Sequence, residues 1–163
     1  MVEDPVTPLR LLERLAKDPD CPVRLLQQLA GHPAWRVRRR VTENRNCPVR
    51  LLERLAEDRD VGVRRAAAFN SRTPPQVLDQ LAEDGFWLVR REVAQNTATP
   101  AQVLAQLAYD EDVAVCLAVA SHPNAAPELV RLLAGDQDIR VRRAALRNPN
   151  LPEGYRQLSR LVQ

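Results

Sequence analysis

A period of 26 residues runs through most of this 163-residue chain. The dipeptide Leu-Ala returns at this spacing, together with a proline, a valine and an asparagine or its polar substitute. The leucines of the dipeptide are Leu29, Leu55, Leu81, Leu107 and Leu133, each 26 residues after the one before. Because several independent columns share one period, the pattern predicts a repeat protein, in which each unit buries its apolar face against its neighbours.

The repeats define the domain organisation. Five units follow one another, and we expect them to form a single repeat domain over residues 1–163 with a half-repeat cap at each end. The units are 22–47, 48–73, 74–99, 100–125 and 126–151, and the caps are 1–21 and 152–163.

The first half of each unit has the pattern of an amphipathic helix. In the third unit, Val77, Leu78 and Leu81 fall on one stripe of the helical period. Thr73 is expected to be the N-cap of this helix, with Gln76 completing a capping box and a proline at the first helical position. The fourth unit repeats the Thr-Pro start.

The second half of each unit predicts a shorter helix. In the third unit this helix is expected from Trp87 to Gln95 with Val89 and Val93 buried, and Asn96 is expected to end it in the left-handed conformation. Residues 11–16 of the N-terminal cap align with this second helix. No segment alternates apolar and polar residues as a strand does, so the expected fold class is an all-α solenoid.

Composition narrows the class of protein further. A hydrophobic content of 45% with a net charge of only +3 argues against disorder. The longest apolar run, 113–120, is far shorter than the ~20 residues that a membrane helix needs. Residues 1–5 are acidic and lack the apolar stretch of a signal peptide, so we expect a cytoplasmic protein without membrane contact.

The residues of common catalytic and metal sites are scarce. Three cysteines, Cys21, Cys47 and Cys116, are odd in number and lack Cys-x-x-Cys spacing, which argues against a disulfide framework and a metal or iron–sulfur site. His32 and His122 occupy columns held elsewhere by aspartate and asparagine, and are interpreted as turn residues. No glycine-rich phosphate loop or His-Glu-x-x-His motif occurs. We therefore expect no enzyme activity, no metal and no cofactor.

The stretch from Leu81 to Pro100 closely resembles the leucine-rich repeat variant, a bacterial motif of the form LAxDxxxxVRxxVAxNxxTP. The resemblance covers residues 8–158. It implies a right-handed superhelix of paired helices, of which the second is short and sometimes of 3₁₀ type, and it assigns no general activity. The better known member of the family also carries a cysteine-rich iron–sulfur segment. This sequence shows no such segment, so no cluster is inferred from the resemblance.

Arginines form two neighbouring columns on the expected second helices. Of the 24 basic residues, 23 are arginine. The first arginine column is Arg38, Arg64, Arg90, Cys116 and Arg142, and the second arginine column is Arg39, Arg65, Arg91, Leu117 and Arg143.

The first arginine column is expected to be structural. An aspartate precedes its arginines by six residues, a pattern similar to that of HEAT repeats, in which such pairs tie adjacent units together. We expect a ladder of three pairs, namely Asp58 with Arg64, Asp84 with Arg90 and Asp136 with Arg142.

The second arginine column points about 100° away around the helix and is expected to be exposed. The candidate partner-binding residues are therefore the four arginines of this column, together with Leu117 and Phe86. Leu117 makes an apolar gap in a charged ridge, which is either a docking point for a partner or a place of drier packing between units. Trp35 and Trp87 share a column with aliphatic residues and are expected in the core.

The resulting hypothesis is a non-enzymatic scaffold that binds another protein through its second helices. The alternative is a nucleic-acid-binding solenoid, by analogy with HEAT-like DNA glycosylases, in which the second arginine column contacts phosphates. Such binding would weaken steeply as salt rises.

Overall fold

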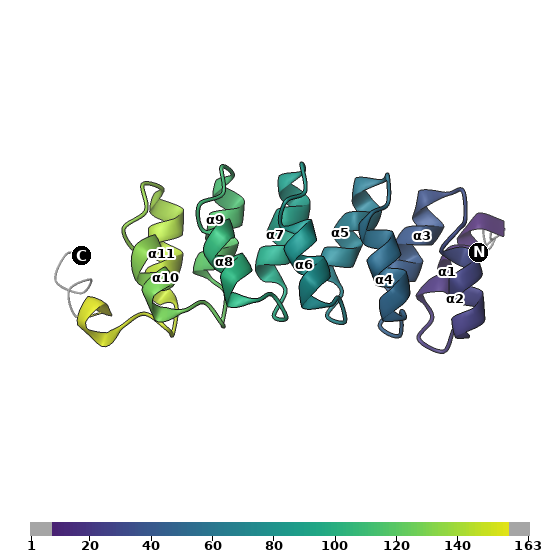
Figure 1. Ribbon diagram of the computed structural model, residues 1–163, viewed down its shortest axis with the longest axis horizontal. Helices are drawn as coiled ribbons and strands as arrows, with labels where there is room; N and C mark the ends of the chain where they lie inside the picture. The colour runs from purple at the N-terminus through teal and green to yellow at the C-terminus, as the bar shows by residue number, and fades with distance from the viewer. Residues whose placement is uncertain (1–7, 157–163) are drawn as a thin grey trace, which may run out of the picture. The chain divides into compact units, whose positions relative to one another are not determined.

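The computed structural model describes residues 8–156, in which short turns connect a series of helices and no strand occurs (Figure 1). The all-α repeat fold predicted from the sequence is confirmed. The helices are α1 (Pro8–Lys17), α2 (Val23–Leu29), α3 (Trp35–Thr42), α4 (Val49–Ala56), α5 (Val61–Phe69), α6 (Pro75–Leu81), α7 (Trp87–Gln95), α8 (Ala101–Leu107), α9 (Val113–Ala120), α10 (Pro127–Leu133) and α11 (Ile139–Arg147).

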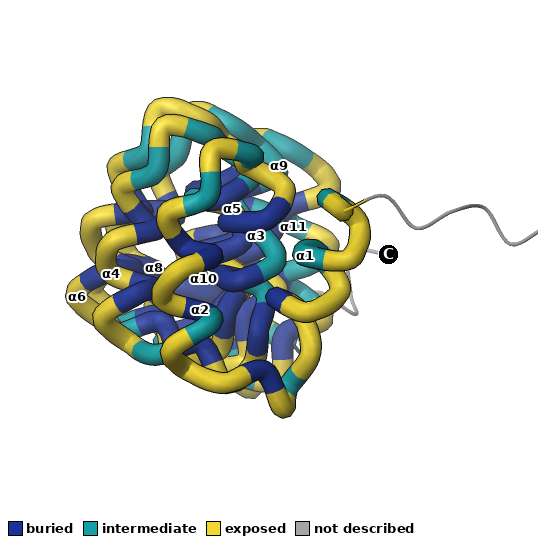
Figure 2. The backbone as a smooth tube through the Cα atoms, turned by 90° about the vertical axis from the view of Figure 1, so that its right-hand side faces the viewer, coloured by how far each residue is buried: buried dark blue, intermediate teal, exposed yellow. Residues whose placement is uncertain are grey.

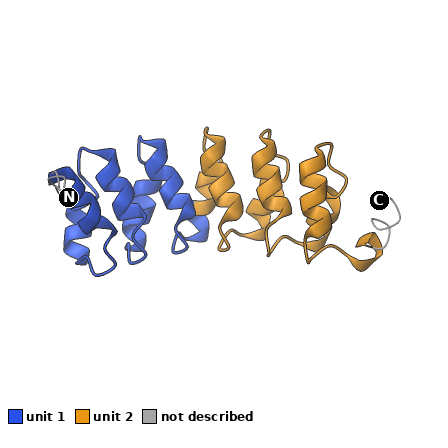
Figure 3. Cartoon of the chain, turned by 180° about the vertical axis from the view of Figure 1, so that it is seen from behind, with its two compact units in different colours: residues 1–77 blue, residues 78–163 orange. Residues whose placement is uncertain are grey.

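The chain forms two compact units, residues 1–77 and 78–163 (Figure 3). In the first unit, α1 packs against α3 and α3 packs against α5, while α2 and α4 lie on these helices. The terminal helix α1 therefore takes the place of a second helix, as its alignment predicted. In the second unit, α7, α9 and α11 pack in the same succession, with α8 and α10 against them. The predicted C-terminal cap is described only as far as Arg156.

Leucines of the first helices and valines of the second helices build the core of each unit. The buried stretches of the chain are dark blue in Figure 2. Leu52 on α4 and Val63 on α5 are fully buried, and Leu104 on α8 and Val115 on α9 repeat the arrangement in the second unit. These residues occupy the apolar columns of the 26-residue period. The period therefore reports which face of every helix is turned inward.

The second helices differ from the expectation that the family resemblance gave. They are α-helices of 8 or 9 residues, whereas the first helices have 7 or 8. Aspartates stabilise three of their N-termini, because the Asp60, Asp112 and Asp138 carboxylates accept hydrogen bonds from main-chain N–H groups two residues on. The second helices are thus the longer of each pair and have α rather than 3₁₀ geometry.

The capping box expected at Thr73 is not formed. The Thr73 hydroxyl donates a 2.6 Å hydrogen bond to the Ala67 carbonyl of the preceding helix, and the Thr99 hydroxyl does the same to Val93. Helix α8 begins only at Ala101, with Pro100 as an N-cap that lacks a side-chain hydrogen bond. The threonine therefore satisfies a carbonyl at the end of one helix instead of an N–H group at the start of the next.

The asparagines that end the second helices also depart from the expected geometry. Asn96 has φ −74° and ψ 120°, and Asn70 and Asn148 are extended in the same way. No residue within residues 8–156, glycine included, has positive φ. These asparagines are therefore required for their side chains and not for a left-handed backbone.

The side chains of three asparagines, Asn44, Asn70 and Asn148, each join one repeat to the preceding repeat. The Asn44 amide donates to the carbonyls of Ala16 and Asp18 at 2.9 and 2.7 Å. Asn148 donates to Ala120 and His122 at 2.8 and 3.1 Å. The side-chain oxygens in turn accept an N–H from two residues on, which closes the turn. We call this buried series the asparagine ladder, and its members are Asn44, Asn70, Asn96, His122 and Asn148.

His122 reproduces the asparagine chemistry with its two ring nitrogens. Its Nδ1 accepts a 3.0 Å hydrogen bond from the Asn124 main-chain N–H, so the ring proton is assigned to Nε2. Nε2 lies 3.1 Å from the Asn96 carbonyl and donates to it. Burial lowers the pKa of His122, although the bond to Asn96 works in the opposite direction. The residue is therefore neutral when it fills its place in the ladder.

Leu81→Ala tests the repeat register. Leu81 is 2% exposed on α6, so the substitution should lower the free energy of unfolding by about 2–5 kcal/mol. Leu132→Ala on the exposed side of α10 is the matched control and should change it by less than about 0.5 kcal/mol. Urea denaturation followed by circular dichroism measures both. Equal effects of the two substitutions would show that the register is wrong.

The pH dependence of the free energy of unfolding tests the role of His122 in the asparagine ladder. The folded chain holds His122 neutral, whereas the unfolded chain binds a proton near the ordinary pKa of 6.5. The contribution of His122 is therefore complete above pH 6.5 and is lost as the pH falls below it. His122→Asn keeps the hydrogen bonds without the titration. Unfolding free energies at pH 7.5 and 5.5 should differ less in the variant than in the wild type, and an unchanged difference would contradict the assignment.

Candidate binding surface

Arg38 of the first arginine column joins two repeats in the first unit. Its Nε and Nη2 donate to the two carboxylate oxygens of Asp58 at 2.6 and 2.8 Å. Its Nη1 donates to the His32 and Pro33 carbonyls at 2.8 and 2.9 Å. Burial raises the pKa of the Asp58 carboxyl, but hydrogen bonds from Arg38 and the main chain of Asp60 outweigh it and lower the pKa. The pair is thus a bidentate, charged contact.

Arg90 makes the same contact in the second unit. It donates to the Asp110 carboxylate at 2.7 and 2.8 Å and to the Asp84 carbonyl at 2.8 Å. The carboxylate partner is thus Asp110, 20 residues along, and not the predicted Asp84, which supplies its main chain. Arg64 and Arg142 likewise donate to the carbonyls of Asp58 and Asp136. The six-residue spacing therefore marks a carbonyl contact within a repeat, and the carboxylate pair links adjacent repeats.

The second arginine column is not uniform. Arg39 pairs with Glu43 at 2.7 Å, and Arg91 pairs with the buried Glu92 at 3.0 Å. The Arg91 guanidinium also lies 5.4 Å from the centre of the Trp87 ring. Arg65 and Arg143 are exposed, as predicted for the whole column, whereas Arg39 and Arg91 are partly buried.

Several aromatic residues are exposed. Trp35 and Trp87, expected in the core, are each 38% exposed, and the ring of Trp35 reaches the neighbouring repeat beside Gly62. Phe86 is exposed, as expected, because it replaces the aspartate of that column. Phe69 and Tyr109 are more exposed still and were missed by sequence reasoning. The available signal was an aromatic residue in a column that other repeats fill with small or polar residues.

Arg91 and Leu117 share a groove in the second unit. Its volume is 390 Å³, and Gln95, Ser121 and His122 also line it. Leu117 is partly exposed at the position where other repeats place an arginine. The groove therefore sets a cation beside an apolar side chain.

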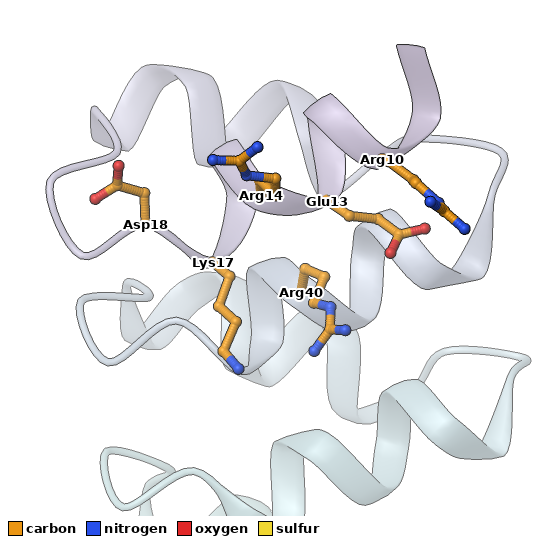
Figure 4. A pocket seen from close by; sticks show the side chains of 6 residues that line it. All are labelled: Arg10, Glu13, Arg14, Lys17, Asp18 and Arg40. Atoms are coloured by element: carbon orange, nitrogen blue, oxygen red, sulfur yellow. The ribbon is translucent and has the colours of Figure 1, made fainter. Parts of the chain in front are cut away.

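A basic pocket of 510 Å³ lies on α1 and α3 of the first unit (Figure 4). Arg10, Arg14 and Lys17 follow one another at helical spacing on α1, and Arg40 of α3 completes the set of cations. Glu13 and Asp18 also line the pocket. The repeat columns do not reveal this site because most of it belongs to the terminal cap.

The thiols offer little reactivity. Cys21, Cys47 and Cys116 are buried and free, and burial raises the pKa of Cys47 to about 12. Such a thiol is neutral and is a poor nucleophile and metal ligand. Over residues 8–156, no group of three or more His, Cys, Asp or Glu side chains is placed to hold a metal ion. No helix in this range is long and apolar enough to cross a membrane.

Comparison with known proteins agrees with this geometry. Residues 90–152 match the model of the Leucine Rich Repeat Variant domain. A solved leucine-rich repeat variant, described as having a novel repetitive protein structural motif, is 28% identical with a TM-score of 0.68 over 88% of this chain. The match covers 60% of that protein, so this chain spans about three fifths of its length. The predicted resemblance is confirmed, and the fold is of the leucine-rich repeat variant type.

A second solved structure, of an engineered protein, is 18% identical and covers 83% of this chain and 85% of its own, with a TM-score of 0.49. No curated protein matches the sequence.

Replacement of Arg90 tests the arginine–carboxylate link. Arg90→Gln leaves the Asp110 carboxylate, which is 6% exposed, without its cation, so the free energy of unfolding should fall by about 3 kcal/mol. Arg143→Gln removes an exposed arginine from the equivalent region of α11 and should change it by less than about 0.5 kcal/mol. Chemical denaturation at pH 7 compares them. A loss of the same size in both variants would refute a specific role for the pair.

Proposed function

We propose that this protein is a non-enzymatic scaffold that binds another protein through the surface of its second helices. The repeat fold supports a scaffold in general. The observation that carries the specific proposal is the groove of the second unit, where Arg91 and Leu117 stand together. A segment that combines an acidic and an apolar side chain fits this pairing, because each side chain meets its complement.

The charges favour a protein partner over nucleic acid. A phosphate-binding ridge gains its affinity from cations that are available to the phosphates. Glu43 already accepts hydrogen bonds from Arg39 and Arg40, and Glu92 from Arg91. Leu117 then interrupts the second arginine column. A mixed surface of this kind suits the varied chemistry of a protein better than a uniform polyanion.

The energetics of Arg91 support a binding role. Its Nε is buried and has no hydrogen-bond partner within residues 8–156. An unsatisfied buried donor costs stability, and such costs are typical of positions retained for function. The adjacent Trp87 supplies an exposed aromatic face, and Trp and Arg are the residues that most often dominate binding energy at interfaces.

The basic pocket on α1 and α3 is the feature that favours the nucleic-acid alternative, because its four cations outnumber its two carboxylates.

We propose a cytoplasmic location for either function, since three cysteines without disulfides fit a reducing compartment.

Leu117→Arg tests the proposal with little risk to folding, because the other repeats place arginine at this position. The tagged wild-type chain should capture a protein from native lysate with or without nuclease treatment. Leu117→Arg should reduce that capture more than the combined Arg39→Gln, Arg65→Gln and Arg91→Gln change. Val23→Arg adds the same charge to an exposed apolar site on α2 and should leave the capture intact.

Circular dichroism checks that every variant is folded. Capture that disappears after nuclease treatment, or that only the triple arginine change removes, would instead support nucleic-acid binding. Capture that none of the variants alters would place the function on another face of the molecule.

A further inference from the structure

The first arginine column has one position without arginine, and its neighbours show what that position usually does. At two of the occupied positions, a guanidinium donates to a carboxylate 20 residues along and to a carbonyl six residues back. Arg38 does so with Asp58 and His32, and Arg90 does so with Asp110 and Asp84. The chain itself therefore defines a guanidinium site that returns with the repeat.

Cys116 occupies the equivalent position in the fourth repeat. Its Sγ lies 3.3 Å from the carbonyl of Asp110, the group six residues back. The carboxylate 20 residues along is that of Asp136. Within residues 8–156, no cation pairs with this carboxylate, and its Oδ1 accepts only the main-chain N–H of Asp138 at 2.7 Å. The acceptors of the guanidinium site are thus present without the guanidinium.

A cavity of 600 Å³ lies at this position in the second unit. Three carboxylates line it, and two of them already have cationic partners, since Asp110 pairs with Arg90 and Asp138 with Arg140. Only Asp136 remains without a cation among the charged residues of the lining. The charge of the site is therefore concentrated on the group that a ladder arginine would contact.

We propose that this cavity binds an arginine side chain of a partner protein, which takes the place of the arginine that the first arginine column lacks at Cys116. The planar guanidinium matches the carboxylate bidentately and reaches the carbonyl beside it, as Arg38 and Arg90 do within the chain. Lysine offers a point charge without this fork.

The rim of the cavity suits the remainder of an arginine side chain. Tyr109 is 75% exposed, and its ring offers a face to which a cation is attracted. Leu132 and Val141 line the cavity as well and supply apolar surface for the methylene stem. This lining differs from the groove of Arg91 and Leu117, so the two sites can be tested separately.

The probe is the blocked tripeptide acetyl-Gly-Arg-Gly-amide, with a citrulline peptide of the same shape and no charge as its control. Titration is followed by amide NMR shifts, with Asp138 as the reporter because its N–H is bonded to Asp136. The arginine peptide should shift this signal saturably and the citrulline peptide should not. Asp136→Asn should weaken binding about tenfold or more, because a charged hydrogen bond is lost.

Two further variants complete the design. Cys116→Arg restores the missing arginine of the first arginine column from the chain itself. It should therefore abolish peptide binding and raise the denaturation midpoint. Glu83→Gln removes an exposed carboxylate elsewhere in the unit and should leave binding unchanged. If Cys116→Arg does not fold, Asp136→Asn still decides the question.

Equal binding of the arginine and citrulline peptides, or binding that Asp136→Asn leaves unaltered, would overturn the proposal. Free arginine tested beside the peptide separates a small-molecule site from a protein-docking site, and tighter binding of the free amino acid would overturn the protein assignment. Leu117→Arg should leave binding of the arginine peptide intact. The proposed arginine site and the proposed scaffold function can therefore fail independently of each other.

Discussion

A buried side-chain amide that bonds to the main chain of the preceding repeat is the interaction on which each unit of this protein depends. The carbonyls at the end of a helix lack partners within that helix, and a stack of short helices multiplies such ends. Asn44 and Asn148 satisfy these carbonyls and fix the distance between repeats in the same contact. Hydrophobic packing alone would tolerate sliding of one repeat over the next, whereas these directional bonds do not.

The arginine contacts add charge to this scheme and connect structure with recognition. Where Arg38 and Arg90 are present, their guanidinium groups are consumed in holding adjacent repeats together. Where Cys116 and Leu117 replace two arginines in succession, the same unit acquires a cavity and a groove. The repeat that departs most from the pattern is therefore the one with the most features of a binding surface, which is the expected consequence of adapting one member of a regular series.

The sequence predicted most of the fold and less of the site. The period identified the helix pairs, the terminal helix α1 and the inward faces, because these depend on spacing alone. It also identified His122 as an asparagine equivalent. It did not reveal that the Thr73 hydroxyl donates to a carbonyl of the preceding helix or that Arg90 pairs with Asp110. Both contacts depend on how the chain segments pack. Trp35 was misplaced because a column average hides whether a larger side chain extends beyond the core.

The asparagine ladder has a further consequence for how such a chain can change in length. Its inter-repeat bonds join residues 26 or 28 positions apart. Deletion or duplication of one complete period returns every donor to an equivalent acceptor, while any other change inside a repeat leaves several buried groups without partners at once. The length of such a chain can therefore change by whole repeats, whereas insertions and deletions inside a repeat are selected against. Duplication followed by divergence of a single copy can then supply new surfaces without disturbing the bonds that hold the older repeats.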